Sequence, residues 1–367
     1  MFPCLTGSCT ILSTGIEDNK MVLSHPPSSI RNVEELEYVL SDPTEKTIRA
    51  MGALEGDLVV LGVGGKMGPT LARMAKRASD LAGVVRRVTG VARFSTPRLQ
   101  EQLHDWGVET HRCDLLDPKS HSQLPDAANV VYMAGMKFGA TGQESLTWAM
   151  NTFLPGLVSE RYRYSRVAVF STGNVYGLSP VSRGGSKEGD PLHPVGEYAL
   201  SCLGRERIFE HFSRTEQIPM SVLRLNYAVE LRYGVLLDIA QRVFAEQVIP
   251  LEMGYLNAIW QADAAAMSLQ SLNYASTPPF VINIAGPELI SVRRTAEQFA
   301  ARFKKPVRFE GEESGDALLN NAQAAFQLFG YPQVGVESML PWIADWVERG
   351  EETLAKPTHF ENRAGNF

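Results

Sequence analysis

The chain has 367 residues, of which 44% are hydrophobic and 21% charged, and its formal net charge is -6. These values are typical of a globular protein, and the length suggests two domains. No basic run points to nucleic acid or an anionic membrane surface, and no apolar stretch is long enough to span a bilayer. The cysteines and histidines follow no metal-ligand spacing, so we expect no metal site and free thiols in a reducing cytoplasm.

Residues 1–55 are predicted to form an N-terminal extension that is partly disordered and carries short helices. The start of the chain lacks the basic segment and long apolar centre of a signal peptide. Two helices are expected, one at 33–40 with Asn32 as its cap and one at 44–54 with Asp42 as its cap. A surface cover or a dimer contact is the simplest interpretation of this extension.

A glycine-rich stretch follows the extension and is the strongest motif in the chain. The apolar run 58–61 predicts a fully buried strand of a parallel sheet. Gly62, Gly65 and Gly68 follow directly, and Pro69 then opens a segment with helical spacing. A strand, a glycine turn and a helix in this order are typical of a dinucleotide-binding site.

Each glycine of this turn has its own physical task. Gly62 allows a sharp exit from the strand, Gly65 leaves room for a pyrophosphate at the backbone, and Gly68 permits close packing of the helix on the sheet. The backbone N–H groups of Lys66 and Met67 are expected to face the phosphates at the helix N-terminus, where the helix dipole favours negative charge.

Further apolar runs alternate with helical patterns along the next part of the chain. The predicted strands are 84–92, 108–113, 129–133, 166–170 and 220–225, and the clearest helices are 144–160, with a kink at Pro155, and 197–212. This alternation predicts an α/β protein with a doubly wound, parallel Rossmann sheet. Ligands bind such sheets at the carboxyl ends of the strands, where the short polar motifs of this chain fall.

The domain boundaries are placed where the alternation of predicted strands and helices becomes less regular. Residues 56–225 are assigned to the Rossmann domain, with 258–286 returning to it. Residues 226–257 and 287–350 are expected to form a smaller α/β substrate-binding lobe, followed by a tail at 351–367. The smaller lobe should cover the edge of the sheet and leave a cleft between the two parts.

Together, these motifs resemble the extended short-chain dehydrogenase/reductase family, the NAD(P)-dependent epimerases and dehydratases of nucleotide sugars. The resemblance covers residues 57–350 and includes the spacing of the glycine turn. It also includes an Asp-Leu pair that contacts adenine, an Ala-Gly-x-Lys stretch beside the cofactor and a helix asparagine. By this resemblance the cofactor contacts outside the glycine turn are Asp114, Leu115, Ala134, Gly135, Lys137 and Asn151.

Two further segments resemble the catalytic motifs of the family. Residues 171–177 resemble the serine/threonine motif that ends in Val-Tyr-Gly, and residues 194–198 resemble the approach to the catalytic tyrosine. The match implies that Thr172 is the catalytic hydroxyl and Tyr198 the acid/base. The family keeps a lysine four residues after this tyrosine, one helical turn away, to lower its pKa. This chain has Cys202 at that position.

The missing lysine leaves two interpretations open. In the first, the protein is an enzyme in which Lys137, or the positive nicotinamide ring of the cofactor, supports the tyrosinate of Tyr198. In the second, it is a non-catalytic NAD(P)-binding or interaction protein, and Tyr198 serves packing and hydrogen bonding. Arg205 lies two turns beyond Tyr198 on the same helix face, too far along the helix to replace the lysine directly.

Some residues near the motifs have both a functional and a structural interpretation. Arg93 follows a predicted strand and suits the extra phosphate of NADP, which favours NADP over NAD, although a solvated loop charge is the alternative. Asp263 is expected to cap a helix, and Trp260 to pack in the core and not line the cleft.

The sequence therefore predicts an NAD(P)-dependent oxidoreductase, similar to epimerases and dehydratases, that acts on a sugar or nucleotide-sugar-like small molecule. A homodimer is a possible assembly. The substrate is not readable because substrate contacts fall in the variable C-terminal lobe, and a fold does not determine a function.

Overall fold

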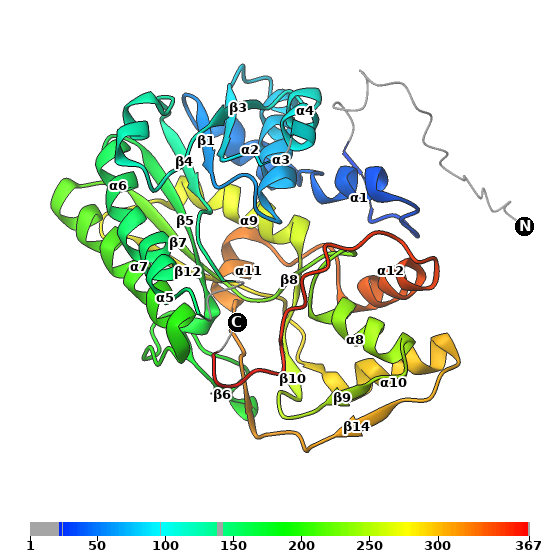
Figure 1. Cartoon of the computed structure of the whole chain (residues 1–367). Helices are drawn as coiled ribbons and strands as arrows, with labels where there is room; N and C mark the ends of the chain where they lie inside the picture. Colours follow the sequence, from blue (N-terminus) through cyan, green and yellow to red (C-terminus); the bar gives the residue numbers. More distant parts are fainter. Residues whose placement is uncertain (1–21, 24, 96, 138–141, 366–367) are drawn as a thin grey trace, which may run out of the picture.

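The computed structural model describes residues 22–23, 25–95, 97–137 and 142–365, so the disordered leader expected at the start of the chain lies outside the described residues. At the centre is a seven-stranded sheet with the order β12-β7-β5-β4-β1-β2-β3, in which all neighbours are parallel (Figure 1). Its strands are β1 (Leu58–Leu61), β2 (Val88–Ala92), β3 (Glu109–Arg112), β4 (Asn129–Tyr132), β5 (Arg166–Thr172), β7 (Met220–Leu225) and β12 (Phe280–Ile284). The predicted doubly wound Rossmann fold is confirmed.

Helices cover both faces of this sheet. The α-helices of the described residues are α1 (Val33–Leu40), α2 (Glu45–Ala53), α3 (Gly68–Leu81), α4 (Pro97–Asp105), α5 (Glu144–Trp148), α6 (Leu154–Arg161), α7 (Gly196–Glu216), α8 (Val235–Phe244), α9 (Gln261–Ser271), α10 (Val292–Phe303), α11 (Gln323–Phe329) and α12 (Val336–Glu348). Val59 of β1 packs in one core cluster with α6 and α7, whereas its neighbour Leu58 packs in another with α3 and α9 (Figure 1). Successive residues of a strand point to opposite faces, which explains why this strand is apolar throughout.

Two predicted elements have different bounds in the structure. The apolar run 84–92 becomes a strand only from Val88 onward, where its pairing with β1 begins. The helix expected at 144–160 is interrupted, but by the π-helical segment Ala149–Phe153, and Pro155 lies at the start of the helix that follows. A proline in the first turn leaves the helical hydrogen bonds intact, so the break precedes it.

The N-terminal helices are folded against the Rossmann domain. Asn32 caps α1 as predicted, because its side chain accepts a hydrogen bond from the backbone of the first turn. The prediction that Asp42 caps α2 is wrong, since the cap is Thr44. The carboxylate of Asp42 instead pairs at 2.8 Å with Arg77 of α3, whose side chain is fully buried. A buried guanidinium needs a charged partner, and this need outweighs a helix cap.

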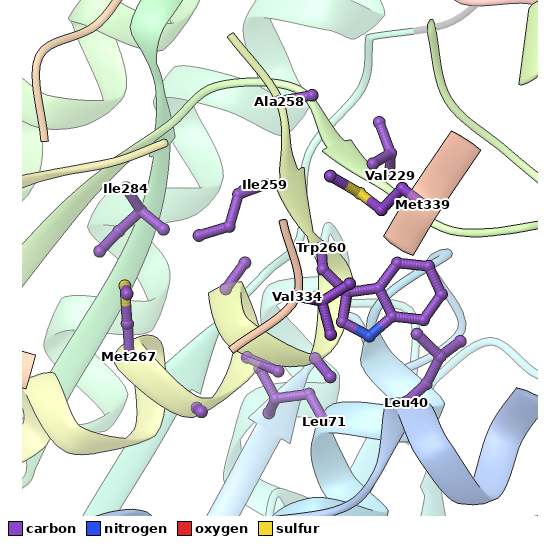
Figure 2. Packing of buried hydrophobic residues seen from close by; sticks show 14 of the residues in the cluster. Leu40, Leu71, Val229, Ala258, Ile259, Trp260, Met267, Ile284, Val334 and Met339 are labelled. Carbon is purple, nitrogen blue, oxygen red and sulfur yellow. The ribbon is translucent and has the colours of Figure 1, made fainter. Parts of the chain in front are cut away.

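The start of α9 also differs from its prediction. Asp263 lies inside its first turn and does not cap it, and its carboxylate accepts backbone hydrogen bonds from Gln333 and Val334 at 2.9 and 3.1 Å. Trp260 packs in the core, as expected. Figure 2 shows its indole beside Leu40 and Val334, so that α1, α9 and the loop before α12 meet around one side chain.

The C-terminal half contributes a smaller set of elements beside the sheet. Helices α8, α10 and α12 pack together, and short strands pair around them. These strands are β6 (Ser179–Pro180), β8 (Ala228–Val229), β9 (Val248–Pro250), β10 (Tyr255–Leu256), β11 (Ile259–Trp260), β13 (Ile290–Ser291), β14 (Arg308–Glu310) and β15 (Asp316–Ala317). Residues 350–365, here called the C-terminal strap, then run past β8 and β10 toward β6 (Figure 1). In the described part of the chain, every helix is too short or too polar to cross a membrane.

Candidate functional site

The glycine turn between β1 and α3 is closely packed on two sides and open on the third. Gly62 has φ +86°, and a Cβ there would lie 2.7 Å from the backbone nitrogen of Ala134, at the end of β4. A Cβ on Gly68 would lie 2.3 Å from the carbonyl oxygen of Val63. A Cβ on Gly65 would meet nothing closer than 3.4 Å, and Gly65 is exposed. The turn therefore has no room for a side chain at Gly62 and Gly68, where backbone segments are in contact, and it is open at Gly65, where a phosphate would bind.

Three lysines influence one another around this turn. The ammonium of Lys66 lies 3.1 Å from the centre of the Tyr233 ring. Burial, together with repulsion from Lys137 and Lys356, lowers the pKa of Lys66 to about 6, against attraction from the acidic groups of Asp238 and Glu230. Because like charges converge here, a bound phosphate would relieve their repulsion. Met67, which precedes the first helical residue, is partly buried.

The carboxyl ends of β2 and β3 carry two guanidinium groups. Arg93 is exposed directly after β2. Arg112, at the end of β3, donates to the carbonyl oxygens of Arg93 and Phe94 at 2.9 and 2.6 Å. Phe94 has φ +45°, so these two bonds hold a turn that few non-glycine residues adopt. Sequence reasoning missed Arg112 because it lies within a segment interpreted only as a strand.

The predicted adenine contacts lie at the end of β3. Asp114 is exposed, and its carboxylate accepts the backbone N–H of Leu116 at 3.1 Å, whereas Leu115 is buried in the core. Ala134 is buried at the end of β4, next to the glycine turn. These residues therefore lie at the carboxyl edge of the sheet, on the same side as the glycine turn.

Thr172 and Tyr198 come together at the same edge. Thr172 is the last residue of β5, and its hydroxyl is held by Asn174, to whose side-chain oxygen it donates at 2.9 Å. Tyr198 lies in the first turn of α7, and its side chain is hydrogen-bonded to Thr172. Burial raises the pKa of Tyr198, and the neighbouring thiol of Cys202 adds to this rise, while Arg205 and Thr172 oppose it. The phenol is therefore protonated at neutral pH.

A cation reaches Tyr198 from a different element than in the family pattern. The ammonium of Lys137, on the loop after β4, lies 5.5 Å from the centre of the Tyr198 ring. The pKa of Lys137 is lowered to about 8, because burial lowers it and the thiol of Cys202 offsets only part of this effect. Cys202 is fully buried, hydrogen-bonded to Tyr198, and its pKa is raised by burial. Lys137 thus lies near both the tyrosine and the position from which the lysine is missing.

Arg205 and Asn151 lie beneath the loop that carries Lys137. Arg205 donates to the carbonyl oxygen of Phe170 at 2.9 Å and to the side-chain oxygen of Asn151 at 2.5 Å. Asn151 is fully buried and exchanges two hydrogen bonds of 2.9 Å with the backbone of Met136. A Cβ on Gly135 would lie 2.4 Å from the Arg205 guanidinium, so the glycine accommodates the arginine. The structure places Asn151 under the loop, where it is hydrogen-bonded to the backbone of the residue before Lys137.

A buried polar network ties β5 to its neighbours, and sequence reasoning did not find it. Arg224 of β7 pairs with Glu206 of α7 at 2.8 Å, and Ser171 donates to the same carboxylate at 2.5 Å. Arg224 also donates to the hydroxyl of Tyr176 at 2.8 Å, and that hydroxyl donates to Asn283 of β12 at 2.8 Å. The only sequence signal was polar residues in otherwise apolar strands. This network fixes β5, β7, β12 and α7 relative to one another.

Comparison with protein families and solved structures agrees with the fold described above. The model of the NAD dependent epimerase/dehydratase family matches residues 58–229. A comparison with curated proteins found no match. A UDP-glucuronic acid 4-epimerase from Bacillus cereus, solved in complex with NAD, has a TM-score of 0.67 and 17% identity over 80% of this chain and 99% of that one. The UDP-glucose 4-epimerase from Thermotoga maritima, solved with UDP-glucose, has a TM-score of 0.67 and 16% identity over the same shares.

Proposed function

We propose that this chain, whose residues 58–229 match the model of the NAD dependent epimerase/dehydratase family, is an NAD(P)-dependent oxidoreductase acting on a sugar or nucleotide-sugar-like substrate. The observation that carries the proposal is the hydrogen-bonded pair of Thr172 and Tyr198 at the sheet edge that also holds the glycine turn. Solved structures with the same fold contain NAD and UDP-sugars, which supports this substrate class as a proposal.

The residues around the glycine turn suit a nicotinamide dinucleotide. The backbone beside Gly65 is open to a pyrophosphate, and the neighbouring Lys66, whose pKa is about 6 in the free protein, would take up a proton when phosphate binds. Arg93 and Arg112 lie where the adenosine ribose of a Rossmann cofactor would end, so we propose NADP as the preferred form. When bound, the cofactor supplies the hydride acceptor or donor.

Tyr198 is proposed to move the proton. Its phenol is protonated in the protein described here, so it is ready to donate a proton to an oxygen that gains negative charge, as in the reduction of a ketone. The Thr172 hydroxyl would hydrogen-bond that oxygen and keep it within reach. In the reverse direction Tyr198 must lose its proton, and a nearby positive charge then favours the phenolate.

Lys137 is proposed to provide that positive charge in place of the missing lysine. Its ammonium faces the Tyr198 ring at 5.5 Å, and its pKa of about 8 leaves it charged at neutral pH. Asn151 and Arg205 hold its loop from below, so the position of the cation is built into the fold.

A non-catalytic, dinucleotide-binding protein is the second candidate, and Cys202 favours it. A buried thiol supplies no cation, and here it raises the pKa of Tyr198, whereas catalysis at neutral pH benefits from a lower value. The two candidates share the cofactor site and differ only in turnover.

Location and assembly complete the proposal. Cys113 and Cys202 are free and buried, which is consistent with a cytoplasmic protein. We propose a homodimer through α5, α7 and the π-helical segment between α5 and α6, where large apolar side chains are exposed. They are Leu146 at 40%, Trp148 at 39%, Phe153 at 57% and Leu200 at 42%.

The test begins with calorimetric titration of the purified protein with NAD⁺ and NADP⁺. The protein is then incubated with UDP-glucose and with UDP-glucuronic acid, while reduced-nicotinamide absorbance and the sugar products are followed, because an epimerase leaves no net absorbance change. We expect dinucleotide binding and product formation in the wild type and binding alone in Tyr198→Phe. Tyr164→Phe, a change at a tyrosine that is 94% exposed, is the matched control. Dinucleotide binding with no product from either sugar would favour the second candidate.

A further inference from the structure

The C-terminal strap is anchored along the smaller lobe. The backbone N–H of Leu354 donates to the carbonyl oxygen of Arg232 at 2.9 Å, and that of Thr358 donates to the carboxylate of Asp238 at 2.7 Å. Phe360 is 1% exposed within the main core cluster. These anchors show that the strap up to this phenylalanine belongs to the folded protein.

Nearer its end, the strap is held by one arginine. Arg363 donates to the carbonyl oxygens of Glu252 and Asp316 at 3.0 and 3.1 Å and also pairs with the Asp316 carboxylate. The anchors named so far all lie beyond β7, on the side of the smaller lobe. The strap is therefore anchored to the smaller lobe as far as Arg363, and the residues beyond Arg363 then reach the Rossmann domain.

The tip of the strap touches the start of the helix that carries Tyr198. A Cβ on Gly365 would lie 2.1 Å from the carbonyl oxygen of Val195, and a Cβ on Gly196 would lie 2.4 Å from the carbonyl oxygen of Gly365. Both glycines have positive φ, +75° and +80°. The two backbones are thus in direct contact, two residues before the proposed acid/base, and only glycine allows this approach.

The strap tip also closes a cavity beside the catalytic pair. Asn174, Val195 and Leu318 line one side of this cavity, and Asn362, Arg363 and Gly365 of the strap line the other. Asn174 is the residue that holds the Thr172 hydroxyl. The cavity measures about 280 Å³, including space open to solvent. The seated tip therefore occupies the side of the site on which Asn174 lies.

We propose that the C-terminal strap is a gate over the substrate side of the site, and that its tip must lift from α7 before a nucleotide-sugar-like substrate reaches Thr172 and Tyr198. This inference rests on the proposed function for the class of substrate. Lifting breaks the glycine contact and the Arg363 bonds, while the buried Phe360 remains as the hinge-side anchor. The dinucleotide site at the glycine turn lies outside the closed cavity, so cofactor entry does not depend on the tip.

Gly365→Ala tests the gate because its Cβ collides with the backbone of Val195. Gly350→Ala is the matched control, since Gly350 has a similar φ of +66° and a Cβ there would meet nothing within 4 Å. Arg363→Ala provides a second way to release the tip. The probes are UDP-glucose, whose association rate is followed by stopped-flow fluorescence, NAD⁺ binding by calorimetry, and the rate of cleavage after Glu361 by a glutamate-specific protease, read by mass spectrometry.

If the strap is a gate, Gly365→Ala and Arg363→Ala should raise the UDP-glucose association rate several-fold and speed the cleavage, while Gly350→Ala matches the wild type. NAD⁺ affinity should stay within about twofold in all four proteins. Faster cleavage with an unchanged or slower UDP-glucose association would overturn the gate, as would the absence of UDP-glucose binding in every protein. Failure of the proposed function is distinguishable, because it would show in the wild type as NAD⁺ binding without product from either sugar, or as no NAD⁺ binding at all.

Discussion

The glycine turn at residues 62–68 and the surroundings of Tyr198 lie at the same edge of one sheet, but the first is formed by backbone and the second by side chains. The turn is made of backbone. Its shape depends on the absence of side chains at Gly62 and Gly68, where any Cβ would meet another main-chain atom closer than 3.0 Å. Backbone cannot be repacked as a side chain can, so these positions tolerate no substitution without a shift of the helix.

The surroundings of Tyr198 are made of side chains that come from separate elements. Lys137 arrives from the loop after β4, Thr172 from β5, and Cys202 and Arg205 from α7. A group lost from one element can be replaced from another that ends at the same place. This difference between the two regions explains why a lysine can be absent from α7 when another element supplies a cation, whereas the glycine spacing remains intact because no other element can substitute for the absence of a side chain.

The largest effect is expected from Tyr198→Phe, which removes only the proposed proton carrier. If this region is catalytic, kcat should fall by about 10²–10⁴, the range for loss of general acid–base catalysis. Cofactor affinity and the unfolding midpoint should change little, as measured by calorimetry and urea denaturation. Equal turnover by the variant and the wild type would refute the proposed role of Tyr198 as the proton carrier.

The side-chain region should also depend on its buried charges. Glu206→Gln leaves Arg224 without its ionic partner inside the protein, where both side chains are only 6% exposed. The free energy of unfolding should fall by about 3–5 kcal/mol, as when one member of a buried pair is removed. Glu210→Gln, on the same helix and 32% exposed, should cost less than about 1 kcal/mol. Similar losses in urea denaturation would contradict the structural role of the network.

The backbone region predicts a loss of binding without a loss of fold. Gly65→Asp places bulk and negative charge where the pyrophosphate is proposed to lie, at a position with open space around it. Dinucleotide affinity should fall at least about 100-fold, or roughly 2.7 kcal/mol. Gly189→Asp, where a Cβ would also meet nothing, is the control for charge. Unchanged binding to the folded Gly65 variant would refute the cofactor site.

A smaller effect should separate the two dinucleotides. Arg93→Ala should weaken NADP⁺ binding by roughly 1.5–3 kcal/mol, the scale of a hydrogen bond to a charged group, and change NAD⁺ binding far less. Competition titrations with both cofactors measure the difference directly. Equal changes for the two would mean that Arg93 is a solvated loop charge.

The smallest expected effect is a pH dependence of cofactor affinity. Lys66 has a pKa of about 6 in the protein, below its ordinary value of 10.5, and bound phosphates should raise it. The complex would then hold a proton that the free protein lacks, so affinity should rise as the pH falls toward about 6, the pKa of Lys66 in the free protein. Calorimetry in buffers of different ionisation enthalpy should detect proton uptake. Lys66→Met should abolish the uptake, and its persistence would assign the proton elsewhere.

The sequence by itself determined the Rossmann half of the protein. Apolar runs of strand length, glycines directly after the first strand and helical spacing after them are local patterns, because a buried parallel strand must be apolar on both faces. The strand Met220–Leu225 has the predicted bounds. Thr172 and Tyr198 were found through motifs, and the structure brings their side chains together.

Only the tertiary structure decided which side chains interact with one another. Asp42 and Asp263 looked like helix caps, but a buried guanidinium and two backbone N–H groups compete for their carboxylates more strongly. Lys137 faces Tyr198, and the strap tip meets α7, across long stretches of chain. Such contacts depend on where distant elements end in space, and local propensity carries no information about that position.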